Sequence, residues 1–144
     1  MSFFFSKKIS IFSAQKEQSQ LLSQIDLGVE NGSVYGEMFL KGDRLILLST
    51  SYSYKSYTKT ENYVSILIYD ISDPKNPQKV TSSCQQGDYN TARMIGDYIY
   101  LVSNCYINVV DVEKDKPESY VPSVICNDVM TAVPADSIYR YGDT

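Results

Sequence analysis

One pattern limits this chain more than any other: a segment of its first half returns in its second half. The stretch Gly42–Ser49 (GDRLILLS) comes back as Gly96–Ser103 (GDYIYLVS), 54 positions later. A short apolar segment precedes each copy: Met38–Leu40 in the first and Met94–Ile95 in the second. A Gly-Asp turn between two strand-like segments indicates a β-hairpin whose apolar side chains pack on a sheet. The sequence therefore predicts the same hairpin twice.

The segments upstream of the two turns also repeat. Ile9–Phe12 (ISIF) precedes the first turn by about as much as Ile66–Tyr69 (ILIY) precedes the second, and a further strand-like segment follows each. A third unit begins at Ile107–Val112 (INVVDV). Four short strands repeated about every 50 residues are typical of β-propeller blades. We predict an all-β chain of propeller-like blades, each a four-stranded antiparallel sheet, with about two and a half repeats.

These repeats divide a single all-β segment, residues 1–144, into units at 9–50 and 64–104 and an incomplete unit at 105–144. Propellers have about 4 to 8 blades, and an open stack leaves strand edges unpaired. Three explanations follow: a piece of a longer protein with further blades, a ring completed by several copies as a homo-oligomer, or closure as a β-sandwich. The ending at Arg140–Thr144 favours the first.

The sequence contains no recognisable catalytic motif. The chain has no histidine, which excludes Ser-His-Asp and Cys-His hydrolysis and histidine-based acid–base chemistry within it. Neither GxxxxGK[ST] nor GxGxxG occurs. The carboxylate pairs Asp70/Asp73 and Glu113/Asp115 lie in turns, where aspartate usually bonds the backbone and sets the turn. We therefore predict a non-enzymatic protein with no catalytic residues, no cofactor and no metal site.

Charge and hydropathy narrow the class of partner. The net charge is −4 and the basic residues are scattered, so neither nucleic acid nor anionic lipid is expected to bind. No apolar run is long enough to insert into a membrane. The trio Phe3–Phe5 precedes Lys7 and Lys8, the reverse of the order in a signal peptide, so no export signal is visible.

Three cysteines stand at positions 84, 105 and 126. One interpretation is a disulfide plus a free thiol in an oxidising compartment. The other, which we favour, is three small and mostly buried residues in strands.

One stretch has the composition of a binding loop. Ser51–Tyr63 is rich in tyrosine and serine, the residues that supply rigid contact area and adaptable hydrogen bonds in binding loops. Within it we predict a partner-contact loop at Tyr52, Tyr54, Lys55 and Tyr57. The alternative is an extended hairpin whose tyrosines cover neighbouring strands.

Ile68–Pro77 (IYDISDPKNP) and Ala92–Val102 (ARMIGDYIYLV) resemble a known family, bacterial and archaeal proteins with a C-terminal β-propeller domain, distantly related to WD-type repeats. They are also similar to the LVIVD-type repeats of surface propellers. Ser119–Pro122 and Pro134–Tyr139 extend the resemblance, which covers about residues 36 to 140. It implies a propeller fold and a secreted or cell-surface location, and it carries over no active-site residues.

Two functional hypotheses follow. The first is a non-enzymatic extracytoplasmic propeller segment that recognises a protein or a glycan. The alternative is part of a larger hydrolytic enzyme whose active residues lie outside this chain.

Overall fold

The structure is a computed structural model that describes residues 8–14, 18–27, 34–56, 59–106, 116–126, 129–137 and 139. Its strands are β1 (Lys8–Phe12), β2 (Leu21–Asp26), β3 (Val34–Lys41), β4 (Arg44–Ser56), β5 (Lys59–Asp70), β6 (Gln78–Gln86), β7 (Asp88–Ile95), β8 (Tyr98–Asn104), β9 (Ser123–Cys126) and β10 (Val129–Ala132). Two 3₁₀ turns follow β8, η2 (Pro117–Tyr120) and η3 (Ala135–Ser137). Among the described residues no helix is long and apolar enough to cross a membrane.

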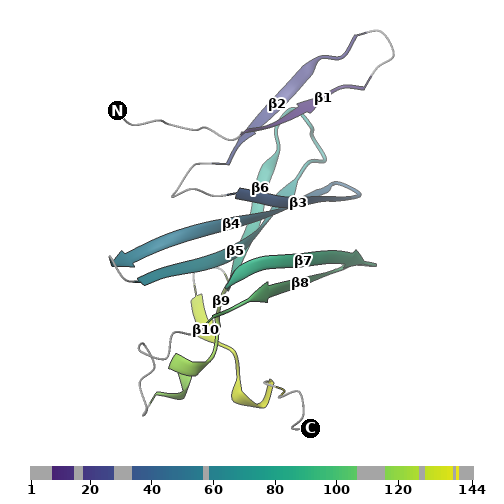
Figure 1. The fold of residues 1–144 in the computed structure, drawn as a ribbon. Coiled ribbons are helices and arrows are strands. Elements are labelled where there is room, and N and C mark those ends of the chain that lie inside the picture. Colours follow the sequence, from purple (N-terminus) through teal and green to yellow (C-terminus); the bar gives the residue numbers. More distant parts are fainter. Residues whose placement is uncertain are drawn as a thin grey trace.

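The strands form three antiparallel sheets (Figure 1). The largest has six strands in the order β10-β9-β6-β5-β4-β3, and its part β3 to β6 is a simple meander. The other two are the hairpins β1-β2 and β7-β8. The all-β, antiparallel fold predicted from the sequence is confirmed.

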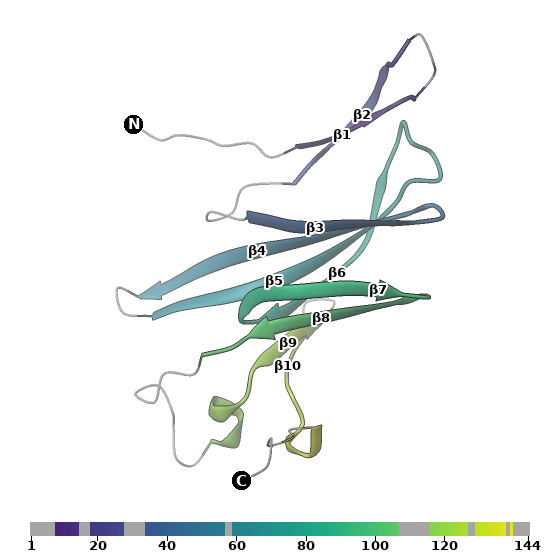
Figure 2. The same cartoon turned by 45° about the vertical axis from the view of Figure 1, so that its right-hand side comes forward.

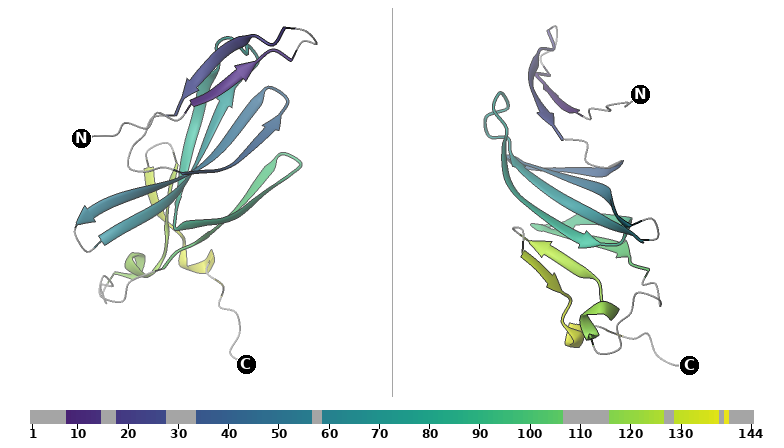
Figure 3. Two further views of the ribbon diagram at one scale, coloured as in Figure 1. Left: turned by 45° about the horizontal axis from the view of Figure 1, so that its top comes forward. Right: turned by 90° about the vertical axis from the view of Figure 1, so that its left-hand side faces the viewer.

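The three sheets lie in layers, with the six-stranded sheet between the two hairpins (Figures 2 and 3). What we call its first face carries Leu45, Leu47, Leu67 and Tyr69, which are brought to one side by the register Leu45↔Tyr69 and Leu47↔Leu67. These residues pack with Ile25 of β2 and with Ile9 and Ile11 of β1 in one apolar cluster. Hairpin β1-β2 therefore covers the first face.

The opposite, second face carries the alternate residues of the same strands. Ile46, Leu48 and Val64 are buried there. Hairpin β7-β8 lies on this side, with Ala92 of β7 buried as well. Burying an aliphatic side chain fully contributes about 1.5–3 kcal/mol, so residues such as Leu48 are main contributors to stability.

Polar bonds join β7-β8 to the six-stranded sheet. The Gln85 Nε2 atom donates to Ser103 Oγ at 2.7 Å, and the Tyr89 hydroxyl donates to the Glu37 carboxylate. Desolvation of the phenol and the neighbouring carboxylate raise the pKa of Tyr89 to about 12. At the other end of the hairpin, Lys41 pairs with Asp97. The lysine lowers the pKa of the Asp97 carboxyl.

The two Gly-Asp turns have the predicted hairpin form. Gly42 and Gly96 have φ values of 53° and 61°, in the left-handed region that glycine adopts without steric cost. The carboxylates of the intervening proline-rich linker set its turn: Asp70 Oδ1 accepts from the Ser72 N–H at 2.9 Å and Asp73 Oδ1 from the Lys75 N–H at 3.0 Å. The Ser72 bonds, with Arg44 beside them, lower the pKa of Asp70 to about 2.

The sheets group the strands differently from the sequence units. The units 9–50 and 64–104 each run over four consecutive strands, whereas the central meander joins β3-β4 of the first unit to β5-β6 of the second. The sequence units therefore repeat the order of strands along the chain. That each unit is also one folded blade stays a prediction. The expected start of the third unit, residues 107–112, lies outside the described residues.

Candidate functional site

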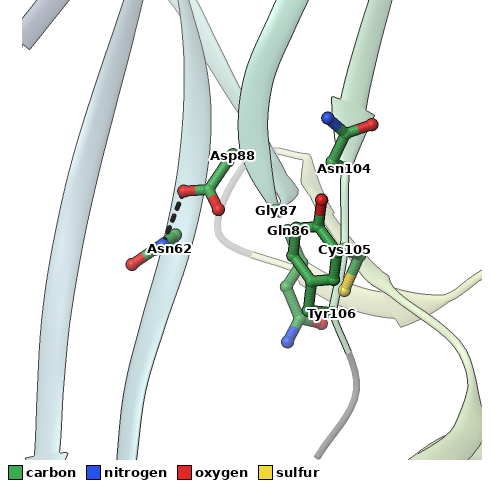
Figure 4. Close-up of a pocket in the computed structure, with 7 residues that line it drawn as sticks. All are labelled: Asn62, Gln86, Gly87, Asp88, Asn104, Cys105 and Tyr106. Atoms are coloured by element: carbon green, nitrogen blue, oxygen red, sulfur yellow. Dashed lines mark hydrogen bonds between the residues drawn. The ribbon is translucent and has the colours of Figure 1, made fainter.

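A polar pocket opens where the ends of β5, β6, β7 and β8 meet (Figure 4). Its volume is about 240 Å³, and it is lined by Asn62, Gln86, Gly87, Asp88, Asn104, Cys105 and Tyr106. The pocket thus sits at the junction of the six-stranded sheet and hairpin β7-β8.

Gly87 makes this junction possible. It connects β6 to β7 with a φ of 118°, which L side chains rarely adopt. A Cβ atom there would lie 2.7 Å from the carbonyl oxygen of Asn104. The Gly87 N–H donates to the Asn62 carbonyl oxygen at 2.7 Å. Only glycine lets the chain pass this close to β8 while keeping that bond to β5.

One wall of the pocket is an amide–carboxylate pair. The Asn62 Nδ2 atom of β5 donates to Asp88 Oδ1 of β7 at 2.6 Å, and Figure 4 shows the two side chains facing each other. The Asn62 Oδ1 atom is buried and has no hydrogen-bond partner. A buried acceptor left unpaired costs about 1–3 kcal/mol, and such costs are typically found where they serve a role.

The other walls are held by the neighbouring strands. The Gln86 Oε1 atom accepts from the Ser123 N–H at 3.0 Å and from the Ser123 hydroxyl at 3.2 Å, so β9 fixes this amide. The Ser103 hydroxyl donates to the Gln86 carbonyl oxygen at 3.0 Å. Asn90 Nδ2 donates to Asn104 Oδ1 at 3.3 Å. The lining is therefore already organised without a ligand.

The chemistry of this lining suits a neutral, hydroxyl-rich ligand. Side-chain amides both donate and accept hydrogen bonds, as ligand hydroxyls do. Tyr106 is 84% exposed and offers an aromatic surface at the rim. The lining has one carboxylate, whereas glycoside hydrolysis ordinarily uses two. No group of three metal-ligating side chains occurs among the residues that the structure describes.

The predicted partner-contact segment is the end of a hairpin rather than an open loop. Tyr52 and Tyr54 lie on β4 and pair with Asn62 and Thr60 of β5. Strand β3 pairs with β4 only as far as Thr50, and β6 pairs with β5 only from Tyr63 onward. Residues 51–56 and 59–61 of the hairpin β4-β5 thus project beyond the neighbouring strands, as Figure 1 shows.

The side chains of Tyr52, Tyr54 and Lys55, and the whole of Tyr57, lie outside what the structure describes. Their role in partner contact therefore stays a prediction. The structure does place Asn62, the register partner of Tyr52, in the wall of the pocket.

None of the three cysteines forms a disulfide with another described residue. Cys84 lies in β6 with its sulfur 3.2 Å from the Ser65 hydroxyl, and Cys105 lines the pocket. Cys126 lies in β9 and is exposed, so the expectation of burial fails for it. Since Cys84 pairs with Ile125 and Cys126 with Ser83, their side chains point to opposite faces of the sheet and do not form a disulfide.

Sequence reasoning did not single out the pocket residues. Asn62 and Asp88 are 26 positions apart and meet only because β5 and β7 lie in adjacent layers. A usable signal was present in Gln86-Gly87-Asp88, where one glycine separates two strand-like segments and indicates a close approach of the backbone.

A family model described as Beta propeller domain matches residues 3–144, which confirms the propeller-like fold predicted from the sequence. No curated protein and no solved structure matches the chain.

Proposed function

Because the chain belongs to the beta propeller domain family, we propose that it is a non-enzymatic recognition module and that it binds a glycan in the pocket between β5, β6, β7 and β8. The observation that carries this proposal is the pocket lining: three amides, one carboxylate and an exposed phenol, with no cationic side chain. A binding module on a rigid sheet scaffold needs no more than such a preorganised set of polar groups.

A saccharide fits this chemistry better than a charged metabolite. Its hydroxyls can accept from the amide N–H groups of Gln86 and Asn104 and donate to the Asp88 carboxylate, all of which line the pocket. The rim tyrosine, Tyr106, provides an aromatic face against the carbon side of a sugar ring.

An extracytoplasmic location completes the proposal. It is supported by the resemblance of residues 36–140 to secreted and cell-surface propeller proteins. The alternative, a blade of a larger hydrolase, needs catalytic residues from outside this chain, because the sequence has no histidine and the pocket lining has a single carboxylate.

Binding of sugars tests the glycan proposal directly. The probes are neutral mono- and disaccharides containing glucose, galactose, mannose and N-acetylglucosamine, followed by amide chemical-shift changes in the intact chain. We expect at least one to shift the amides of Gly87, Asp88 and Asn104. Replacing Tyr106 with alanine should weaken that affinity by about tenfold, equivalent to ~1.4 kcal/mol.

The matched control is Tyr139→Ala, which removes another highly exposed tyrosine, 90% exposed, that does not line the pocket. It should leave the affinity unchanged. A panel in which no sugar moves the pocket amides, or in which Tyr106→Ala binds as well as the control, contradicts the glycan proposal.

The projecting end of β4-β5 supports a second candidate, recognition of a protein. Strands without neighbours expose backbone donors and acceptors that another chain can use. In this case a triple replacement of Tyr52, Tyr54 and Tyr57 by alanine should abolish capture of the partner while leaving sugar-induced shifts in the pocket intact.

A further inference from the structure

The pocket between β5, β6, β7 and β8 presents hydrogen-bond donors and acceptors unequally. Two of its amides, those of Gln86 and Asn104, have side-chain oxygens that the protein already occupies. The Gln86 Oε1 atom accepts two hydrogen bonds from Ser123, which use both of its lone pairs. The Asn104 Oδ1 atom accepts from Asn90 Nδ2 at 3.3 Å. These two amides therefore offer a ligand mainly their N–H groups.

Asp88 supplies the opposite kind of group. Its half-buried side chain stands at the start of β7, and its Oδ1 atom accepts from Asn62 Nδ2 at 2.6 Å. Its second oxygen, Oδ2, has no hydrogen-bond partner within the described residues and takes no part in the bond drawn in Figure 4. A carboxylate only accepts hydrogen bonds, so Asp88 is the side-chain acceptor that a ligand hydroxyl meets in this lining.

Asn62 fixes the orientation of this carboxylate. Its Nδ2 atom donates to Asp88, while its Oδ1 atom is buried without a hydrogen-bond partner among the described residues. Turning the amide over would place Oδ1 against the carboxylate, where two acceptors would face each other with no proton between them. The buried unpaired oxygen is thus the consequence of a donor committed to Asp88. One carboxylate oxygen is held in place, and the other is left for a ligand.

The negative charge of Asp88 is not balanced inside the pocket. The residues that line the pocket include one carboxylate and neither lysine nor arginine. The ion pairs Lys41–Asp97 and Arg44–Asp70 lie elsewhere and do not involve Asp88. Because the pocket is small, about 240 Å³, a second negative charge in it would lie within a few ångströms of the carboxylate and be repelled by it.

We propose that Asp88 sets the charge selectivity of the pocket: it accepts hydrogen bonds from the hydroxyls of neutral sugars and excludes sugars that carry a carboxylate. This selectivity rests on the proposed function and narrows the class of glycan that the site takes. Neutral hexose units are bound, and uronic acids are rejected.

The two amides alone would give a different preference. N–H groups that line a pocket suit acceptor oxygens, and a carboxylate is a stronger acceptor than a hydroxyl because its hydrogen bonds are charge-assisted. Without the charge of Asp88, Gln86 and Asn104 would therefore bind an acidic sugar at least as well as a neutral one. The lining thus contains the donors that would admit an anion and the one group that keeps it out.

The unchanged chain tests this selectivity without any substitution. The probes are the neutral sugar that binds best in the panel above and the uronate that carries a carboxylate in place of its primary alcohol. The amide chemical shifts of Gly87 and Asn104 report the affinity for each. Because like charges brought together in a binding site strongly oppose association, we expect the neutral sugar to bind at least about tenfold more tightly than the uronate.

Asp88→Asn removes the charge while keeping the size of the side chain. Its amide oxygen can still accept from Asn62, so the pair between β5 and β7 is retained, whereas the repulsion of an anion is lost. We expect the affinity for the neutral sugar to fall by about fivefold, because the lost acceptor was charged. The affinity for the uronate should rise, so that the ratio of the two affinities falls to about one or below.

Asp43→Asn is the matched control. It removes the same charge from an exposed aspartate in the turn between β3 and β4, which does not line the pocket. Both affinities and their ratio should stay as in the unchanged chain, which separates a local effect of Asp88 from the change in net charge. Circular dichroism and the dispersion of the amide shifts verify that both variants are folded.

The outcomes distinguish the selectivity from the glycan proposal. If no neutral sugar moves the pocket amides, the glycan proposal fails and the selectivity fails with it. If a neutral sugar binds but its uronate binds equally well, the glycan proposal stands and the selectivity is overturned. The same holds if folded Asp88→Asn keeps the preference of the unchanged chain, or if Asp43→Asn shifts the ratio by as much.

Discussion

The hairpins β3-β4 and β7-β8 share a turn sequence and a strand pattern, yet they are buried differently. Ile46 and Leu48 of β4 are 6% and 0% exposed, whereas their equivalents on β8, Tyr100 and Val102, are about half exposed. The first pair alternates along β4 with Leu45 and Leu47, which pack against β1-β2, so it lies on the opposite side of the sheet, where β7-β8 lies. The second pair faces outward from that layer. The difference teaches that a residue's position in the repeat determines the face of the sheet to which its side chain points. Whether that side chain is buried depends on whether another sheet lies against that face.

The opposite faces of the two hairpins show the reverse difference. Met38 on β3 is exposed, whereas its equivalent on β7, Ala92, is buried against the six-stranded sheet. On β4 both faces are buried, and on the first face the β3 residues Met38 and Leu40 are exposed, whereas β8 exposes Tyr98, Tyr100 and Val102 along one whole face. Burial therefore follows which described layer lies against each strand.

The largest expected effect compares Leu48→Ala with Val102→Ala. Leu48 has no exposed surface, so its truncation leaves a cavity and should lower the free energy of unfolding by about 3 kcal/mol. Val102 is half exposed, and its truncation should cost under ~1 kcal/mol. Urea denaturation measures both. Equal losses in the free energy of unfolding for the two variants would contradict the difference in burial between these equivalent positions.

A smaller effect is expected from the glycines. Gly87→Ala combines an unfavourable φ with a 2.7 Å approach to the Asn104 carbonyl oxygen and should cost about 2 kcal/mol or more. Gly96→Ala meets no atom within 4 Å and should cost about 1 kcal/mol, as should Gly42→Ala in the equivalent turn. Thermal unfolding ranks the three. A Gly96 variant that unfolds at a much lower temperature than the Gly42 variant would show that the two turns are not equivalent.

The smallest effect concerns the bond that joins β7 to β3. The pKa of Tyr89 is raised to about 12 in the folded chain, so the unfolded chain ionises first, near pH 10. The contribution of Tyr89 to stability is therefore complete below pH 10 and is lost as the pH rises toward 12. Relative to Tyr89→Phe, the unchanged chain should lose stability faster over this range. If the urea midpoints of the two proteins change equally from pH 9 to 12, the raised pKa of Tyr89 does not contribute to stability in this range.

The sequence predicted the hairpins at Gly42 and Gly96 and the turn around Asp70 correctly, because these depend on neighbours in the chain. It did not predict the pocket. The pair Asn62–Asp88 depends on how two layers meet, and the hydrogen bonds from Ser123 to Gln86 depend on β9 pairing with β6. The sequence pattern also did not predict that β3 to β6 form one sheet, because the pairing of strands from two repeat units depends on contacts between those units.

By itself, the sequence determined the strand periodicity, the left-handed turns and the absence of histidine chemistry, because each follows from local backbone preference or from residue type alone. Only the tertiary structure decided which equivalent faces are covered and which polar ends converge on a pocket. The physical reason is that burial and convergence arise from contacts between layers, and two copies of one local pattern can meet different neighbours.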